Sequence, residues 1–364
     1  MAVSLNRANE EIAKEQIITN NLREQRLLKE ISIQSTIEHR RRSNECSSYN
    51  ILSVDGGGIR GIMAAIWLRI LELKTNRTCS SMFQMMAGTS TGAIIAAGLS
   101  MPKKHSLTEP AYDTSELVKL YRTRGDDIFV KKERAVYSLR NLSISFSSKY
   151  SSHGKRKIFE HYFRDTSLYE CLTDIVIPAV RSSDIYTHLF TKTGRLNSTP
   201  LVDVLMATTA APTYFKPHCL NGTNFTDGGV QMNNPTLAAY TKAVEYGYEK
   251  ENIFVLSLGT GDYIQEPSPV NAHWDLLHYI THHDAIVKVL LDSQQHNVDY
   301  HMSTLMNDNH YYRWQAWFEE SIKLDSCEPD ILENLENIAY EYWEEMELYD
   351  NNRLNRLIER LRYE

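Results

Sequence analysis

The sequence predicts an α/β protein with a mainly parallel central β-sheet, and three segments carry that prediction. Residues 49–61, 83–99 and 253–261 each run from a short apolar stretch into a tight turn that contains glycines. The first two segments then continue as an apolar helix. A repeated order of strand, turn and helix is typical of parallel sheets, in which the turns that follow the strands gather at one edge. We therefore expect the functional loops of this chain at one edge of the sheet.

The composition bounds the class of protein. At 364 residues, the chain is long enough for one large α/β domain with appendages, or for two domains. Hydrophobic residues make up 42% and charged residues 23%, as in soluble globular proteins, and the formal net charge of -7 argues against a general nucleic-acid binder. The five cysteines are scattered without a C-x-x-C pair, so no disulfide or zinc framework is expected.

The apolar runs bear on the location of the protein. The N-terminus lacks the apolar core of a secretory signal, and the longest apolar runs are far shorter than a membrane span. We expect a cytoplasmic protein, one bound peripherally at membranes, or one exported without a Sec signal.

Residues 49–54 are expected to form the first strand, which leads through Asp55 into the loop GGGIRG at residues 56–61. This loop satisfies the G-x-G-x-x-G fingerprint of dinucleotide-binding proteins. Such a site also needs a strand that ends in an acidic residue about twenty residues further on, and residues 75–84 contain no such ending. The other use of this backbone is to hold an oxyanion on unencumbered amides, with Arg60 fixing the loop. The two glycine turns at 56–61 and 88–92 therefore fit one active site better than a nucleotide site.

Ser90 stands at the centre of the second segment, between Gly88 and Gly92, in the pattern G-x-S-x-G. This spacing is that of a nucleophile elbow, a strand-to-helix turn too sharp for side chains at the two glycine positions. The turn exposes the serine hydroxyl and leaves the following amides at a helix N-terminus, where partial positive charge favours a developing oxyanion. The pattern therefore indicates Ser90 as a nucleophile, which still requires a base.

Asp227 is a candidate for that base. After a turn at Asn221 and Gly222, Phe225 and Thr226 lead to Asp227, which precedes two glycines, an arrangement that is usually only a turn. Here a helix start follows at residues 233–235, so we expect the Asp227 carboxylate to project at the sheet edge beside the other glycine turns.

The remaining regular elements are expected from apolar periodicity and turn residues. Helices are expected at residues 62–73, 114–123 with a Ser/Thr cap, 158–162, 201–209 and 329–348, and strands at residues 174–180, 187–191 and 253–258. Residues 311–318 predict a strand or a packed aromatic element. The helix at 329–348 has an apolar stripe made of Ile331, Leu335, Ile338, Tyr342 and Met346. Residues 6–42 lack Gly and Pro and predict one long helix or two shorter ones. The basic residues 351–364 cover the sheet or touch a partner, and the sequence leaves both open.

Two regions carry clusters of charge or imidazole. Residues 131–157 are basic and rich in serine with interleaved aromatic residues, which is typical of a surface loop or lid, and also of a surface for anionic lipid or, less so, RNA. His278 and His282 lie one helical turn apart but lack an acidic or cysteine partner, so no metal ion is expected there.

Four sequence blocks occur in the order found in the patatin-like phospholipases, which the chain resembles. They are DGGGIRG at 55–61, GTSTG at 88–92, ATTAAPTYF at 207–215 and DGGVQMNNPT at 227–236. The resemblance implies a three-layer α/β/α sandwich with a mainly parallel sheet over a catalytic domain at residues 49–318. It says little about residues 1–48 and 319–364, which we expect to be an N-terminal helical extension and a C-terminal helical segment.

The resemblance also implies site residues, position by position. Ser90 matches the family's nucleophile and Asp227 its partner in a Ser-Asp dyad. Gly56, Gly57 and Gly58 match the family's oxyanion loop, which Arg60 supports. Gly88 and Gly92 support the elbow at Ser90. The nearest alternative is a Ser-His-Asp triad, because these histidines follow Asp227 in the chain: His273, His278, His282, His283 and His296.

The implied function is calcium-independent hydrolysis of ester-linked acyl chains of phospholipids or related lipids, through an acyl-serine intermediate and without a cofactor. The expected partners are a lipid substrate at a membrane surface and an activating protein or small molecule, with no nucleic acid. The alternative is a catalytically quiet lipid- or nucleotide-binding module that uses the glycine-rich loop.

Overall fold

The computed structural model describes residues 48–104, 106, 108–130, 148–263 and 283–363, with the helical backbone alone over residues 283–292. The helix expected over residues 6–42, residues 131–147 of the basic stretch, and the side chains of His273, His278, His282 and His283 lie outside this description. By their internal contacts, Ser48–Tyr240 and Ile253–Glu364 form one compact unit, to which the sheet and the candidate site belong. Thr241–Asn252 falls in the other unit. The domain boundaries at residues 48 and 318 stay predictions.

Five strands of an eight-stranded sheet are parallel and lie next to one another, in the spatial order β3-β2-β1-β7-β9. Their bounds are β1 Tyr49–Val54, β2 Met85–Gly88, β3 Asp174–Arg181, β7 Ile253–Leu258 and β9 Tyr311–Trp314. The antiparallel strands are β4 Tyr186–Thr191, β5 His218–Leu220 and β6 Thr223–Asp227, and a small separate sheet pairs β8 Asp262–Tyr263 with β10 Trp317–Phe318. The expected mainly parallel α/β sheet is confirmed.

The strand register brings the functional turns to one level. Val54, the last residue of β1, pairs with Gly88 of β2 on one side and with Leu258 of β7 on the other. The turns after these three strands therefore begin next to one another at one sheet edge, as expected. Asp227 reaches this edge from the opposite direction, because it ends the antiparallel strand β6 and pairs with Ala179 of β3.

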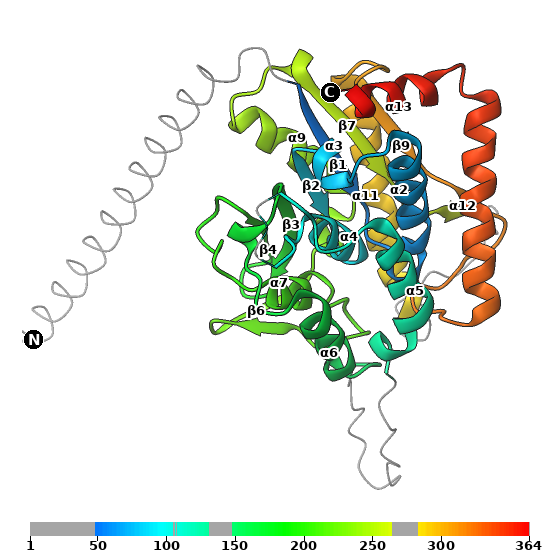
Figure 1. Ribbon diagram of the computed structural model, residues 1–364. Helices are drawn as coiled ribbons and strands as arrows, with labels where there is room; N and C mark the ends of the chain where they lie inside the picture. The colour runs from blue at the N-terminus through cyan, green and yellow to red at the C-terminus, as the bar shows by residue number, and fades with distance from the viewer. Residues whose placement is uncertain (1–47, 105, 107, 131–147, 264–282, 364) are drawn as a thin grey trace, which may run out of the picture. The chain divides into compact units, whose positions relative to one another are not determined.

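Helices cover both faces of the sheet (Figure 1). The α-helices are α2 Gly61–Thr75, α3 Cys79–Met82, α4 Thr91–Ser100, α5 Thr114–Ile128, α6 Ser152–Phe163, α7 Leu201–Thr208, α8 Gly229–Met232, α9 Thr236–Glu245, α11 His283–Leu305, α12 Pro329–Tyr349 and α13 Arg353–Tyr363. The short 3₁₀ helices of the described residues are η1 Gly58–Arg60, η2 Leu168–Glu170 and η3 Lys250–Asn252.

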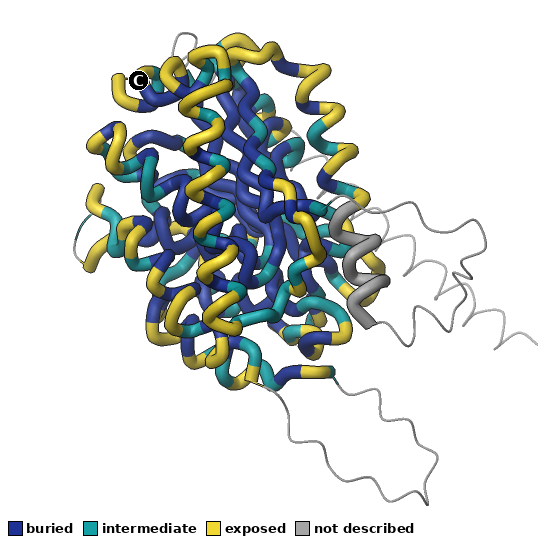
Figure 2. The backbone as a smooth tube through the Cα atoms, turned by 90° about the vertical axis from the view of Figure 1, so that its right-hand side faces the viewer, coloured by how far each residue is buried: buried dark blue, intermediate teal, exposed yellow. Residues whose placement is uncertain are grey.

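Alternating residues of the strands face two different layers. Leu52 of β1 and Leu256 of β7 share one hydrophobic core with α2, α4, α5, α12 and α13. The intervening residues Ser53 and Ser257 face the other way, where both contact the hydroxyl of Thr236, the first residue of α9. The sheet is therefore the middle layer of an α/β/α sandwich, and Figure 2 shows its strands as buried chain inside partly exposed helices.

The structure corrects the expected ends of two helices. α5 starts after Asp113, whose carboxylate accepts a hydrogen bond from the Glu116 amide, so the cap is neither serine nor threonine, and the helix continues to Ile128. α6 starts at Ser152, so residues 152–157, which we expected in the basic loop, are helical. The serine-rich sequence before Lys155 is typical of loops, but burial of the apolar face of α6 stabilises the helix there.

The C-terminal helices belong to the main hydrophobic core. The most buried residues of α12 are Leu332, Leu335, Ala339 and Trp343, while the other four members of the expected stripe are half-buried beside them. α13 buries an i, i+3, i+4, i+7 face made of Leu354, Leu357, Ile358 and Leu361. The C-terminal residues thus pack on the fold. Within the described part of the chain, no helix combines the length and the apolar character that a membrane span requires.

Candidate active site

The turn between β2 and α4 forces Ser90 into an unusual backbone conformation. Its φ of 52° and ψ of -115° lie outside the regions that a residue with a side chain prefers, so the turn is strained. A Cβ atom added to Gly88 would lie 2.2 Å from the carbonyl oxygen of Gly92, and one added to Gly92 would lie 2.1 Å from that of Val54. Close backbone approach therefore requires glycine at both positions, and the expected elbow geometry is present.

Ser90 and Asp227 meet across the sheet edge. The Ser90 hydroxyl donates a hydrogen bond of 2.8 Å to Oδ2 of Asp227, although the two residues are 137 positions apart in the chain. The other carboxylate oxygen, Oδ1, accepts the amide of Gly229 at 2.8 Å. One oxygen is thus held by the turn after β6, which leaves the other directed at the serine.

Burial tunes the basicity of Asp227. It raises the pKa of this carboxyl to about 6, while the Gly229 amide, the Ser90 hydroxyl and the charge of Lys155 each lower the pKa in part. A carboxylate with a pKa near 6 is ionised at neutral pH and is a stronger base than an exposed aspartate. General bases work best when their pKa lies near the working pH.

The C-terminal end of α7 holds both members of this pair. The Thr208 hydroxyl accepts the amide of Ser90 at 3.1 Å and donates to the carbonyl of Pro178 at 2.6 Å. Two residues later, the carbonyl of Ala210 accepts the amide of Asp227 at 3.0 Å. One short segment therefore fixes the backbone of nucleophile and base together.

The hydrogen bonds of the glycine-rich loop hold its carbonyls and so fix the directions of two of its amides. The carbonyl of Gly56 accepts the Thr260 hydroxyl at 2.8 Å and the side-chain amide of Asn233 at 3.4 Å. Because the C=O and N–H of a trans peptide point in opposite directions, the Gly57 amide faces away from these partners. Gly56 itself differs from the expectation: its amide donates to the carbonyl of Asn233 at 3.1 Å and is not available to an oxyanion.

Arg60 orients the next peptide in the same way. Its Nε atom donates to the carbonyl of Gly57 at 3.4 Å, so the Gly58 amide of that peptide points to the other side. Gly58 has a φ of +58° and lies against the carbonyl of Leu324, 2.1 Å from the position of an added Cβ atom. In the described ranges, neither the Gly57 nor the Gly58 amide has a hydrogen-bond partner. Both residues line the same cavity as Ser90.

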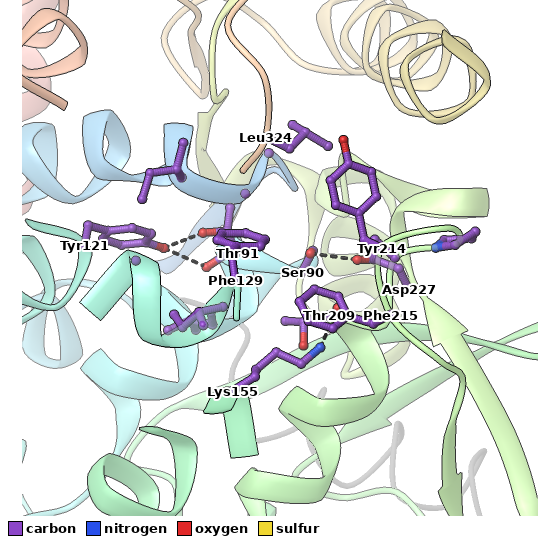
Figure 3. Close-up of a pocket in the computed structure, with 18 of the residues that line it drawn as sticks. Ser90, Thr91, Tyr121, Phe129, Lys155, Thr209, Tyr214, Phe215, Asp227 and Leu324 are labelled. Carbon is purple, nitrogen blue, oxygen red and sulfur yellow. Dashed lines mark hydrogen bonds between the residues drawn. The ribbon is translucent and has the colours of Figure 1, made fainter. Parts of the chain in front are cut away.

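The cavity beside Ser90 is mostly apolar (Figure 3). Its aromatic and aliphatic lining consists of Ile59, Ile94, Tyr121, Ile128, Phe129, Phe159, Ala211, Pro212, Tyr214, Phe215, Val230 and Leu324. Ser90, Asp227 and Lys155 are among its few polar residues. An apolar pocket with a few convergent polar groups is the usual form of a small-molecule site.

Leu324 shows that the expected C-terminal segment contributes to the site. Its carbonyl accepts the amide of Ile59 at 2.8 Å, and its side chain lines the cavity. The neighbouring Asp325 carboxylate accepts hydrogen bonds from Lys149 and from the Tyr150 hydroxyl. Leu324 therefore lies against the glycine-rich loop, which no motif in the sequence indicated.

Several supporting residues had weak signals or none in the sequence. Thr208 and Asn233 lie inside the blocks ATTAAPTYF and DGGVQMNNPT, and Thr260 lies in the turn after β7, but their contacts depend on how these turns meet. Lys155 has no signal of its own in the sequence, because it lies in a basic stretch, yet it is buried. The helical phase of α6 buries Lys155 while Lys157 is exposed.

The described histidines lie elsewhere. Within the described ranges, no histidine lines the cavity beside Ser90. His296 is 60% exposed and lies 2.9 Å from Asp262. Of the residues that the structure describes, no three His, Cys, Asp or Glu side chains gather as a metal site would require. The other four candidate histidines, His273, His278, His282 and His283, have no described side chains.

A buried ion pair supports the loop from behind. Asp55, which precedes the three glycines, lies 2.6 Å from Arg313 of β9, and the guanidinium also donates to the Ser257 hydroxyl at 2.9 Å. Burial by itself lowers the pKa of Arg313, but the charge and hydrogen bond of Asp55 raise that pKa above its ordinary value, so the guanidinium stays charged. The pair ties the start of the loop to two neighbouring strands.

The chain was compared with known proteins. The family model described as patatin-like phospholipase matches residues 52–240. Patatin-like protein 2 of Arabidopsis thaliana is 30% identical over 79% of this chain and 80% of its own length, and Patatin-17 of Solanum cardiophyllum is 28% identical over 73% and 75%. The crystal structure of VipD from Legionella pneumophila aligns with 81% of this chain and 67% of its own at 10% identity with a TM-score of 0.38, a likeness too distant to carry an argument. By the family match and the curated relatives, this chain belongs to the patatin-like phospholipase family, and membership of this family indicates lipid acyl hydrolase activity in general.

Proposed function

We propose that this protein hydrolyses ester-linked acyl chains of phospholipids or related lipids, with Ser90 as nucleophile and Asp227 as general base. The observation that carries the proposal is the 2.8 Å hydrogen bond between Ser90 and Asp227 at the wall of an apolar cavity. The amides of Gly57 and Gly58 supply the oxyanion hole, and Gly88, Gly92 and Arg60 support the geometry.

Acylation begins when the Ser90 oxygen attacks the ester carbonyl and its proton passes to Oδ2 of Asp227. The carbonyl oxygen becomes an oxyanion, which the Gly57 and Gly58 amides stabilise together with the N-terminus of α4. Collapse of this intermediate breaks the ester bond, and the proton on Asp227 passes to the departing alcohol oxygen. The products are an acyl-Ser90 ester and the lipid alcohol.

Deacylation repeats these roles with water. Asp227 takes a proton from a water molecule as its oxygen attacks the acyl carbonyl, and the oxyanion forms in the same hole. Breakage of the acyl bond returns the proton to the Ser90 oxygen and releases the fatty acid. Each step uses side chains and amides of this chain, so we propose that turnover needs no calcium ion and continues in a chelator.

The lining of the cavity supports a lipid substrate. Phe129, Phe159 and Phe215 and the aliphatic lining residues offer an acyl chain an apolar environment, and each buried CH₂ group contributes about 0.8 kcal/mol to binding. The binding-module alternative shares this cavity but predicts no turnover.

The first experiment measures fatty-acid release from mixed phospholipid vesicles in EGTA. The native protein is compared with Ser90→Ala and Asp227→Asn, and with Ser81→Ala and Asp126→Asn as controls at exposed positions. We expect release by the native chain and both controls, and at least about a 10³-fold loss in the two dyad variants. If the native protein bound lipid but neither released fatty acid nor reacted at Ser90 with a fluorophosphonate, the binding module would be favoured instead.

No histidine takes part in the proposed steps. We therefore expect Ala variants of His273, His278, His282, His283 and His296 to hydrolyse lipid at near-native rates. Loss of activity in one of them, with the fold intact by circular dichroism, would replace the dyad with a triad.

Regulation by an activating protein or small molecule is a further part of the proposal, supported by the segments that flank the family match. Deletion of residues 1–42 is expected to change the basal rate or the need for an activator. An unchanged rate without any added factor would argue against regulation by this segment. We also propose that the protein acts peripherally at a membrane surface, where its substrate lies.

A further inference from the structure

Lys155 places an amino group in the wall of the apolar cavity. The residue lies on α6 and is 1% exposed. Its Nζ atom donates to the carbonyl of Thr209 at 2.7 Å and lies 3.7 Å from the centre of the Phe215 ring (Figure 3). In the described ranges, no carboxylate forms a direct ion pair with it, so a hydrogen bond and a ring face replace its water.

Such a group is costly to keep. Removing an ammonium from water without a paired carboxylate destabilises the folded protein, and methionine would fill the same space without that cost. The proposed reaction assigns Lys155 no step. Buried ionisable groups inside a site often serve function rather than stability.

The hydrogen bond of Lys155 leads to both reacting residues. Thr209 stands between Thr208, whose hydroxyl holds the Ser90 amide, and Ala210, whose carbonyl holds the Asp227 amide. The lysine therefore anchors the central peptide of the segment that fixes nucleophile and base.

We propose that Lys155 is a positioning residue of the Ser90–Asp227 pair, which anchors the end of α7 and keeps Asp227 ionised through its positive charge. This inference rests on the proposed function, because it assigns the lysine a purpose in that reaction.

The charges around Lys155 support this role. Asp227 on β6 is the charged group that acts on it most, and burial lowers the pKa of Lys155 to about 7 against that attraction. The charge of Lys155 is the smallest of the influences that act on the pKa of His218 on β5. His218 is hydrogen-bonded to Asp203 of α7, which also pairs with Arg156 of α6. The phenols of Tyr121 and Tyr214 are the other titratable groups of the lining.

The direction of the effect follows from this arrangement. A nearby cation favours the carboxylate form of Asp227, and so lowers the pKa that burial raises. Loss of the cation raises that pKa, and the base is then protonated over a wider acidic range. The acid limb of the activity profile must move to higher pH.

The test measures kcat/KM against pH between 4.5 and 8 with p-nitrophenyl butyrate, for Lys155→Met, Lys155→Gln, Lys155→Arg and the native protein. Lys157→Met is the matched control, because Lys157 is exposed on the same helix. We expect the acid limb to rise by about one pH unit in the Met and Gln variants, which is roughly a tenfold loss at pH 5.5. The Arg variant keeps the charge and is expected to retain most of the native limb.

The outcomes separate three cases. Acid limbs within about 0.2 pH units of the native one in folded Met and Gln variants would overturn the proposal while leaving the hydrolase intact. If both variants failed to fold, as judged by circular dichroism, Lys155 would be a structural residue and the proposal would be wrong. Absence of Ser90-dependent turnover in the native protein would instead refute the proposed function.

Discussion

Ser90 combines a strained backbone with a hydrogen bond to a buried carboxylate. Gly88 and Gly92 allow the close backbone contacts that keep the turn strained. The Gly229 amide fixes the carboxylate of Asp227 by a hydrogen bond. Strained residues of this kind persist only where their surroundings fix them, and they cluster at functional sites. At the scale of single residues, the arrangement therefore yields predictions about protonation and about backbone amides.

The pH dependence of hydrolysis should follow Asp227. Its pKa is raised to about 6, and the base must be ionised, so kcat/KM is expected to fall tenfold per pH unit below about pH 6 and to level off above it. A profile with a limb near pH 4 would show instead that the base is an ordinary exposed carboxylate. The measurement uses a soluble ester, so that vesicle charge does not change with pH.

Gly58 is expected to be irreplaceable. In Gly58→Ala, the added methyl group meets the Leu324 carbonyl in a left-handed conformation, which displaces the amide proposed for the oxyanion hole. We expect a loss of about 10²–10³-fold in kcat. Gly222→Ala is the matched control, because Gly222 has a φ of +75° but no atom within 4 Å of the added group. It should lose about 1 kcal/mol of stability and no activity.

At the scale of secondary structure, α12 contributes to the core through one face. Leu335 is fully buried on α12, whereas Leu348 of the same helix is 72% exposed. The carbonyl of Ala339, on the buried face, also accepts the indole of Trp67 from α2 at 2.9 Å. Packing and this hydrogen bond together fix the helix on the sheet layer.

Leu335→Ala should therefore reduce the free energy of unfolding by about 2–5 kcal/mol, because it leaves a cavity in the core. Leu348→Ala should change it by less than about 0.5 kcal/mol. Urea unfolding followed by tryptophan fluorescence measures both. Equal effects of the two substitutions would mean that α12 does not pack as described.

At the scale of the whole molecule, the Asp55–Arg313 ion pair joins residues 258 positions apart. It connects the start of the glycine-rich loop to β9, so the site depends on strand pairing across the sheet. Removing one partner of a buried pair leaves an uncompensated charge.

Arg313→Met is expected to destabilise the protein by about 3–5 kcal/mol at pH 7. The buried Asp55 then has a pKa above its unfolded value, so stability is greatest when the carboxyl is protonated and declines as pH rises through the folded pKa. The loss should accordingly be smaller at pH 4.5 than at pH 7. Asp55→Asn combined with Arg313→Met should recover part of it, and a pH-independent loss would contradict this account.

The parallel sheet, the elbow at Ser90 and the order of the family blocks can be predicted from the amino-acid sequence. These features are local: the apolar strands, the glycines that a tight turn requires, and the helices that follow are each encoded within about twenty residues. The resemblance to the family pairs Ser90 with Asp227, although the two residues are 137 positions apart.

The groups that surround the reacting atoms are set by tertiary packing and are not predictable from local sequence. The engagement of the Gly56 amide, the placement of Leu324 over the loop and the burial of Lys155 each depend on contacts between segments far apart in the chain. No local pattern encodes such contacts, because they follow from strand register and helix packing. Whether a side chain is buried, and whether a backbone amide is already hydrogen-bonded, depends on the assembled sheet edge, where separate turns meet.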